Sequence, residues 1–232
     1  MSTTLRLLPA LPRRAAGDAG RGAQIADAEL VAAVDAACAD AVRLAAGRLA
    51  CRIGCTECCV GPFPITALDA VRLAAGLEAL FAADPGRAAG VVERARRAAA
   101  EMAPAFPGDP VSGALDEEEP ENAASRLDAF FATHASLPCP ALEPGTGRCE
   151  LYAHRPLSCR TFGPPMRIEG SDLPPCRLCF AGSPPAEVDA ARGRLECHAL
   201  EEPLERAAEA AGVPGQTLVA FALLRHAPIP SL

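Results

Sequence analysis

The chain has 232 residues, 50% of them hydrophobic and 22% charged, proportions that suit one globular domain with appendages. Its net charge of −7 argues against nucleic acid as the main partner. All 22 basic residues are Arg, which excludes Schiff-base chemistry, a Lys general base and a phosphate-binding loop that ends in Gly-Lys.

The cysteine content indicates a reducing compartment. A secreted disulfide scaffold normally has an even number of Cys behind a signal peptide, whereas this chain has 11. We predict a flexible tail over residues 1–23, because Arg6, Pro9 and Pro12 interrupt the apolar stretch that an export signal needs. No apolar run approaches the length of a membrane span. We therefore expect a cytoplasmic protein without a membrane partner.

Helices are expected in the first half of the chain. Residues 24–49 carry apolar residues at steps of three and four, which is typical of an amphipathic helix. Thr66 with Asp69 three residues later resembles a capping box and predicts the start of a second helix. Asp84 and Pro85 predict the cap and the first residue of a third helix.

The second half has weaker periodicity. Residues 137–181 are rich in Cys and Pro, and short strands are expected only near residues 149–152 and 166–168. The predicted fold class is mainly α: a small irregular helical domain with few short strands, organised around a multi-cysteine metal or cluster site. This domain spans residues 24–181, and C-terminal helices in residues 182–232 pack on it.

The densest chemical signal is a run of four cysteines within nine residues. Thiolates packed this tightly repel one another, so we expect a cation to hold them together. Spacings of two or three residues let one turn of chain deliver several sulfurs to an ion, and the other ligands of such sites usually come from a distant segment. The predicted ligands are Cys51, Cys55, Cys58, Cys59, Cys139, Cys149, Cys159 and Cys176. Eight thiolates could complete two four-sulfur centres, or one cluster plus a second ion.

Some chemically active residues stay outside this ligand set. Cys38 lies on the apolar stripe of the first helix and is expected to be a small buried residue, and Cys197 is expected to be structural. Cys179 forms a CxxC pair with Cys176 and is the next candidate ligand, which the sequence leaves undecided. His154 is expected at the surface.

Arginines near the sulfurs could offset the negative charge of a buried thiolate site. Arg155 and Arg160 bracket Cys159. We expect both to hydrogen-bond a sulfur or a carboxylate beside the site.

The combined pattern resembles the YkgJ-type cysteine-cluster family, a zinc- or iron-chelating domain. The resemblance covers roughly residues 48–180 and rests on CxxxCxxCC from Cys51 to Cys59, then on Cys-Pro-Ala-Leu and Gly-x-Cys-x-x-Tyr-x-x-Arg-Pro-x-x-Cys-Arg-x-Phe, and on Cys176. It implies metal or iron–sulfur binding on a largely helical fold.

The predicted function is binding of a metal ion or an iron–sulfur cluster, with an unidentified protein partner left open. All-sulfur ligation suits zinc and iron–sulfur clusters alike, and the adjacent Cys58 and Cys59 favour iron–sulfur slightly. The alternative is a cluster-dependent enzyme: a redox enzyme, or a methyltransferase resembling the flagellin lysine-N-methylases that carry this domain. Tyr152, Arg155 and Arg160 would then be cofactor-binding residues. A metal-delivery protein is a third hypothesis.

Overall fold

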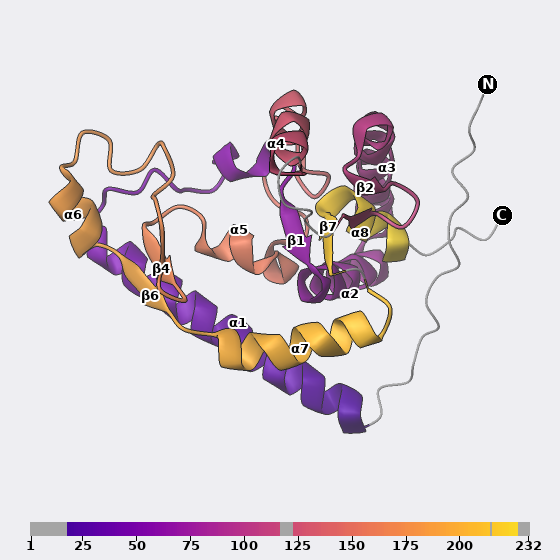
Figure 1. Cartoon of the computed structure of the whole chain (residues 1–232), viewed down its shortest axis with the longest axis horizontal. Helices are drawn as coiled ribbons and strands as arrows, with labels where there is room; N and C mark the ends of the chain where they lie inside the picture. Colours follow the sequence, from indigo (N-terminus) through magenta and orange to yellow (C-terminus); the bar gives the residue numbers. More distant parts are fainter. Residues whose placement is uncertain (1–17, 117–122, 214, 227–232) are drawn as a thin grey trace. The chain divides into compact units, whose positions relative to one another are not determined.

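The computed structural model describes residues 18–116, 123–213 and 215–226 (Figure 1). Within these ranges the chain divides into two compact units. Unit 1 comprises residues 56–156 and 208–226, and unit 2 comprises residues 18–55 and 157–207. The units are interleaved in sequence, since each is assembled from two separate stretches of chain.

Unit 1 is built on helices that pack against one another. Helices α2 (Ala67–Ala83), α3 (Pro85–Met102) and α8 (Val219–His226) are in mutual contact. They bury small and branched apolar side chains, among them Leu77, Val91 and Leu223, each fully buried. Because helices of this length are marginal alone, this burial is what stabilises them.

Short elements complete unit 1. Strand β1 (Pro64–Thr66) pairs antiparallel with β7 (Gln216–Leu218), and β2 (Gly108–Asp109) pairs antiparallel with β3 (Ala114–Leu115). The other elements are α4 (Ala123–Thr133) and the 3₁₀ turns η1 (Glu57–Cys59), η2 (Ala103–Ala105) and η3 (Tyr152–His154). The β1–β7 pair joins the segment after the first cysteine motif to the C-terminal part of the unit.

Both predicted helix caps are confirmed. The Thr66 hydroxyl accepts a hydrogen bond from the Asp69 backbone N–H at 3.3 Å and begins α2. The Asp84 carboxylate accepts one from the Arg87 backbone N–H at 3.0 Å, and Pro85 is the first residue of α3. Such caps satisfy backbone donors that have no partner inside the helix.

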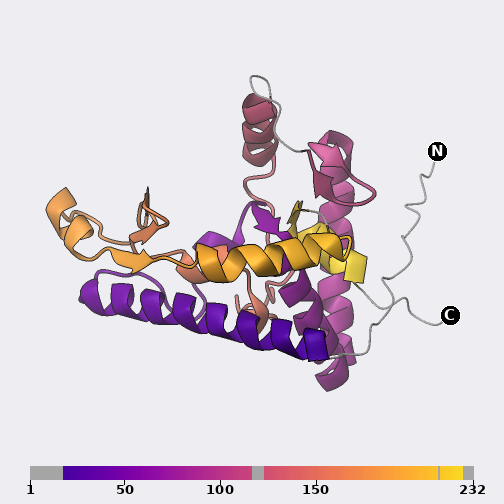
Figure 2. The ribbon, with the colours of Figure 1, turned by 60° about the horizontal axis from the view of Figure 1, so that its bottom comes forward.

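In unit 2, helix α1 (Asp18–Leu44) contacts a strand of a small sheet and the short helix α5 (Leu157–Thr161) (Figure 2). The sheet has the order β5–β4–β6, with β5 (Ser171–Leu173) antiparallel and β6 (Gly193–Leu195) parallel to β4 (Met166–Ile168). A Cβ at Gly193 would lie 2.7 Å from Ala41 Cβ, so glycine permits this close approach of α1. Helix α6 (Pro185–Ala190) lies between β5 and β6 in the sequence, and α7 (His198–Ala210) follows β6.

The mainly α fold class with short strands is confirmed, with local differences. Helix α1 begins at Asp18 and so includes the end of the predicted 1–23 tail, whose residues 1–17 lie outside the described residues. The strand at residues 166–168 is confirmed, but the one at 149–152 is wrong: Cys149 makes an isolated bridge with Leu142, and a 3₁₀ turn follows. Throughout the described ranges, every helix is too short or too polar to cross a bilayer.

Candidate metal-binding site

The first cysteine motif is divided between the two units. Cys51 and Cys55 belong to unit 2, whereas Cys58 and Cys59 belong to unit 1. Each half meets thiols that arrive from the second cysteine region within its own unit, and the two groups are described separately below.

The unit 1 group consists of Cys58, Cys59, Cys139 and Cys149. Cys58 and Cys59 lie on the 3₁₀ turn η1, and the Cys139 backbone N–H donates to the Cys59 carbonyl at 2.8 Å. The bridge between Leu142 and Cys149 returns the chain, so Cys139 and Cys149 flank one loop. The four thiols are close enough to influence one another's ionisation.

The environment of this group lowers the pKa of one thiol and raises the pKa of the other three. A hydrogen bond from the Cys59 thiol lowers the pKa of Cys58 to about 6, and the same bond raises the pKa of Cys59. Burial raises the pKa of Cys139 to about 12 and also raises the pKa of Cys149. Three of the four thiols therefore resist ionisation at neutral pH unless a cation stabilises the thiolates.

Arg155 lies beside the unit 1 group. Its guanidinium donates to the Tyr152 carbonyl at 3.1 Å and stacks 3.9 Å above the centre of the Tyr152 ring, a cation–π contact. Its positive charge also contributes to a lower pKa for Cys58 and opposes the rise in the pKa of Cys149. Arg155 thus acts on the sulfurs through charge, while Tyr152 remains 64% exposed.

The unit 2 group contains Cys51, Cys55, Cys176 and Cys179. The Cys179 sulfur accepts hydrogen bonds from the Ala50 backbone N–H at 3.4 Å and from the Cys51 thiol. Partial burial, followed by the influence of Cys179, Cys55 and Cys176, raises the pKa of Cys51 to about 12. Cys51 and Cys179, from distant segments of the chain, therefore lie near each other.

Backbone contacts hold the unit 2 group together. The Cys176 N–H donates to the Gly163 carbonyl at 2.9 Å, and the Cys179 N–H donates to the Cys176 carbonyl at 2.7 Å. Gly163 has a φ of +125°, and a Cβ there would lie 2.9 Å from the Cys51 sulfur. The positive φ therefore favours glycine at residue 163, and any side chain there would have to displace the Cys51 sulfur.

Arg160 binds a carboxylate, one of the two partners expected for it. Its buried guanidinium contacts both Asp35 oxygens at 2.9 Å. Cys38, expected to be buried, is half-buried, and its thiol donates to the Arg160 carbonyl at 3.3 Å. Cys159 precedes Arg160 in α5 of unit 2, and its assignment as a ligand stays a prediction.

His154 was expected at the surface and Cys197 was expected to be structural. His154 is half-buried and packs on helix α2, where a Cβ at Gly76 would lie 2.6 Å from the His154 Cβ. Cys197 is buried and precedes α7, and burial raises its pKa to about 11. Its thiol contacts the Glu201 carboxylate at 3.8 Å, so it is not a member of either thiol group described above.

The donors in both groups suit a thiophilic metal. In the described residues, no three Cys, His, Asp or Glu side chains are already closed into a geometry that could hold an ion. The chemistry of the donors nevertheless fits zinc or an iron–sulfur cluster, because each group presents four sulfurs, which both kinds of centre bind as thiolates. No His or carboxylate is required to complete either set of four.

Comparison with protein families identifies the chain. The family model CxxCxxCC, described as "Putative zinc- or iron-chelating domain", matches residues 50–177. The chain belongs to the CxxCxxCC family. The match spans both cysteine regions of this CxxCxxCC protein and ends just before Cys179. No curated protein and no solved structure matches the chain.

Cys179 is the member of these groups that the sequence left undecided. Its only signal was the CxxC spacing to Cys176. The contact with Ala50 and Cys51 joins residues about 130 positions apart, and no spacing rule connects them.

Proposed function

We propose that this CxxCxxCC protein binds metal ions or iron–sulfur clusters through thiolates contributed by two distant stretches of chain. The main support for this proposal is the hydrogen bond between the thiols of Cys51 and Cys179 in unit 2. In unit 1 a backbone hydrogen bond likewise joins Cys59 to the distant Cys139. Since the first motif supplies two sulfurs to each unit, the proposal favours one four-sulfur centre in each.

The ligands of the first proposed centre are Cys58, Cys59, Cys139 and Cys149, and those of the second are Cys51, Cys55, Cys176 and Cys179. Cys159 remains an additional candidate in unit 2. Four thiolates around a divalent ion leave net negative charge, which Arg155 would offset near the first centre. The adjacent Cys58 and Cys59 and the all-sulfur donors give a slight preference for iron–sulfur over zinc.

A bound zinc ion would act as a structural crosslink, whereas an iron–sulfur cluster would add the capacity to carry an electron. Thiols that ligate metal must stay reduced, so the proposal places the protein in the cytoplasm. All 11 cysteines are free in the structure, which agrees with a reduced state.

The enzyme hypothesis finds partial support in one feature. The exposed Tyr152 and the half-buried Arg155 form a stacked pair next to the unit 1 thiols, where a small molecule could reach Tyr152. Arg160, by contrast, is buried against Asp35, which favours a supporting role for it. Binding of S-adenosylmethionine or of a redox partner to the loaded protein, but not to Cys58→Ala, would favour an enzyme, and rapid loss of metal to a competing chelator would favour metal delivery.

Metal content tests the proposal directly. The full chain is purified without oxygen, and its zinc, iron and sulfide contents and its visible absorption are measured. Folded protein that contains no metal after supplementation with zinc and with iron would refute the proposal.

Paired variants test the ligand assignment. We expect Cys55→Ser to lose metal from unit 2 and Cys38→Ser to retain it. Cys179→Ser should lose metal as well, whereas Cys197→Ser, which alters an equally buried thiol, should not. Equal metal content across each pair would show that the wrong sulfurs were chosen.

A further inference from the structure

The loop over residues 139–150 carries two thiols of the unit 1 group and is stiff within itself. The Glu150 backbone N–H donates to the Ala141 carbonyl at 2.7 Å. Nearer the tip, the Glu143 backbone N–H donates to the Arg148 carbonyl at 2.8 Å. Because these bonds join the two sides of the loop, the contacts that hold the loop in place also decide where its two sulfurs lie.

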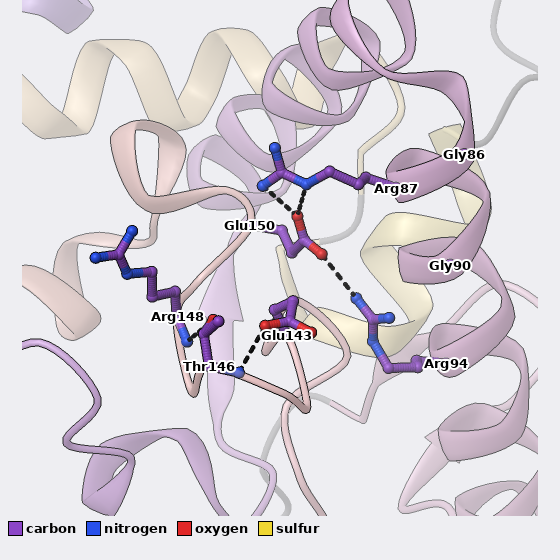
Figure 3. A pocket seen from close by; sticks show the side chains of 8 residues that line it. All are labelled: Gly86, Arg87, Gly90, Arg94, Glu143, Thr146, Arg148 and Glu150. Atoms are coloured by element: carbon purple, nitrogen blue, oxygen red, sulfur yellow. Dashed lines mark hydrogen bonds and ion pairs between the residues drawn. The ribbon is translucent and has the colours of Figure 1, made fainter.

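Helix α3 contacts both ends of this loop through one side chain. Arg94 Nε donates to the Pro140 carbonyl at 2.9 Å, and Arg94 Nη2 lies at an ion-pair distance of 3.7 Å from Glu150 Oε1 (Figure 3). Pro140 follows Cys139 directly in the sequence, and Glu150 follows Cys149 directly. A single guanidinium therefore joins the two residues that follow the thiols.

Arg87 holds the Glu150 carboxylate from a second direction. The Glu150 side chain is only 3% exposed, and its Oε2 accepts from Arg87 Nε at 2.7 Å and lies 2.6 Å from Arg87 Nη2 (Figure 3). A buried ion pair is often no more stabilising than apolar side chains of the same volume, because desolvation offsets the attraction. Its charges and directional donors do, however, restrict the loop to one place on α3.

Helix α3 leaves room for the Arg94 guanidinium. Gly90 precedes Arg94 by one turn, and a Cβ at Gly90 would lie 3.2 Å from Arg94 Nη1. Glycine inside a helix costs about 1 kcal/mol relative to alanine. The helix is therefore less stable at a position where a larger residue would crowd this side chain.

We infer that Arg94 is a positioning residue for the proposed unit 1 centre. By contacting the residues that follow Cys139 and Cys149, it limits how far the two sulfurs can move when no ion is bound. Ligands that are held in place in advance lose less conformational freedom on binding, so the affinity for the ion rises. The inference rests on the proposed function, because it concerns the metal affinity of the unit 1 group.

Charge is the competing explanation for any effect of Arg94. Burial raises the pKa of Cys139, and the positive charge of Arg94 acts against that rise. Lysine keeps the charge but lacks the planar guanidinium whose separate nitrogens reach Pro140 and Glu150. Arg94→Lys therefore separates positioning from charge alone.

The test measures zinc affinity by competition with a chromophoric chelator, on the full chain purified without oxygen. Cys179→Ser is the background, because it removes a ligand of the unit 2 group and leaves the unit 1 group to bind zinc. In this background we expect Arg94→Lys and Arg94→Gln each to weaken zinc binding by about tenfold or more, as loss of a residue that orients a metal ligand does. The control Arg97→Gln removes an exposed charge from the same helix, paired with Glu93 at 3.9 Å, and should change the affinity less than twofold.

A purely structural role for Arg94 gives a different result. Circular dichroism establishes that each variant is folded during the assay, and a loss of stability alone leaves the zinc affinity of folded protein unchanged. In a Cys58→Ser background, which leaves the unit 2 group to bind zinc, Arg94→Gln should have no effect.

Each contrary outcome has its own meaning. Wild-type zinc affinity in Arg94→Lys would overturn the inference in favour of charge. Equal weakening by Arg94→Gln in both backgrounds would overturn it in favour of a general loss of structure. A folded Cys179→Ser protein that binds no zinc would instead refute the proposed unit 1 centre, and the inference with it.

Discussion

Gly76 in helix α2 offers a prediction in which two opposing effects can be weighed. Replacing a helical glycine with alanine normally stabilises a helix by about 1 kcal/mol, because the unfolded chain loses freedom. At Gly76, however, the new Cβ would lie 2.6 Å from His154 Cβ and 2.8 Å from His154 Cγ. Carbon atoms pack at about 3.5 to 4.0 Å, so the overlap is close to 1 Å.

This overlap cannot be relieved by a rotamer change, because the His154 Cβ is fixed to the backbone of η3. Overpacking of a well-packed site costs about 1 to 3 kcal/mol. Because this contact is rigid, its cost should lie near the upper end of that range. After subtraction of the stabilisation that alanine gives a helix, we expect Gly76→Ala to lower the free energy of unfolding by about 1 to 2 kcal/mol. The displaced turn also carries Tyr152 and leads to Arg155, so the environment of the unit 1 thiols should change with it.

The assay is urea unfolding of the full chain followed by circular dichroism. Gly22→Ala in helix α1 is the matched control, because nothing lies within 4 Å of its new Cβ, and it should stabilise by about 0.5 to 1 kcal/mol. The double variant Gly76→Ala/His154→Gly removes the overlapping atoms and should be less destabilised than the sum of its single changes. Stabilisation by Gly76→Ala equal to that by Gly22→Ala would refute the reasoning.

Two further predictions concern charges. The Arg167 guanidinium, which pairs with Asp172 across β4 and β5 at 2.6 and 2.8 Å, holds the pKa of that carboxyl below its ordinary value of 3.8. A lowered pKa stabilises the fold above the unfolded value, and this contribution is lost as pH falls through the folded value. Asp172→Asn should therefore lower the thermal midpoint at neutral pH, and the gap to the wild type should narrow as pH falls below 3.8, the ordinary pKa of the Asp172 carboxyl; a gap that persists unchanged in acid would contradict this. The Glu150 carboxylate, 3% exposed, pairs with the largely buried Arg94 at 3.7 Å and with Arg87 at 2.7 Å, so Glu150→Gln removes the counter-charge of both and should destabilise by about 1 to 3 kcal/mol in urea unfolding. Glu93→Gln, which alters an exposed pair, should stay within about 0.5 kcal/mol, and similar losses in both variants would show that burial does not matter here.

Local parts of this fold could be predicted because local chemistry determines them. Thr66 with Asp69, and Asp84 with Pro85, satisfy backbone donors within a few residues, so both caps can be read from the sequence. The strand predicted at residues 149–152 failed because pattern alone does not show whether a partner strand is present, and Cys149 finds a single bridge to Leu142.

In the candidate site, too, the sequence predicts the local features but not the contacts between distant segments. The sequence identified the thiols of the first motif, since their density has a chemical meaning. It could not say that Cys179 joins Cys51, or that Arg160 binds Asp35 from 125 residues away, because those contacts depend on how α1 packs with later segments. The division of the motif after Cys55 also follows from packing, since adjacent residues carry no mark of the unit to which they belong.

The interleaving of the two units has a consequence for synthesis on the ribosome. Strand β1, just downstream of Cys58 and Cys59, can pair only after β7 has been synthesised, because its partners Thr66 and Gln216 are 150 residues apart in the sequence. Until then Cys58 and Cys59 lack the β1–β7 pair that follows them in folded unit 1. Unit 1 can therefore be completed only after both stretches of unit 2 have been synthesised.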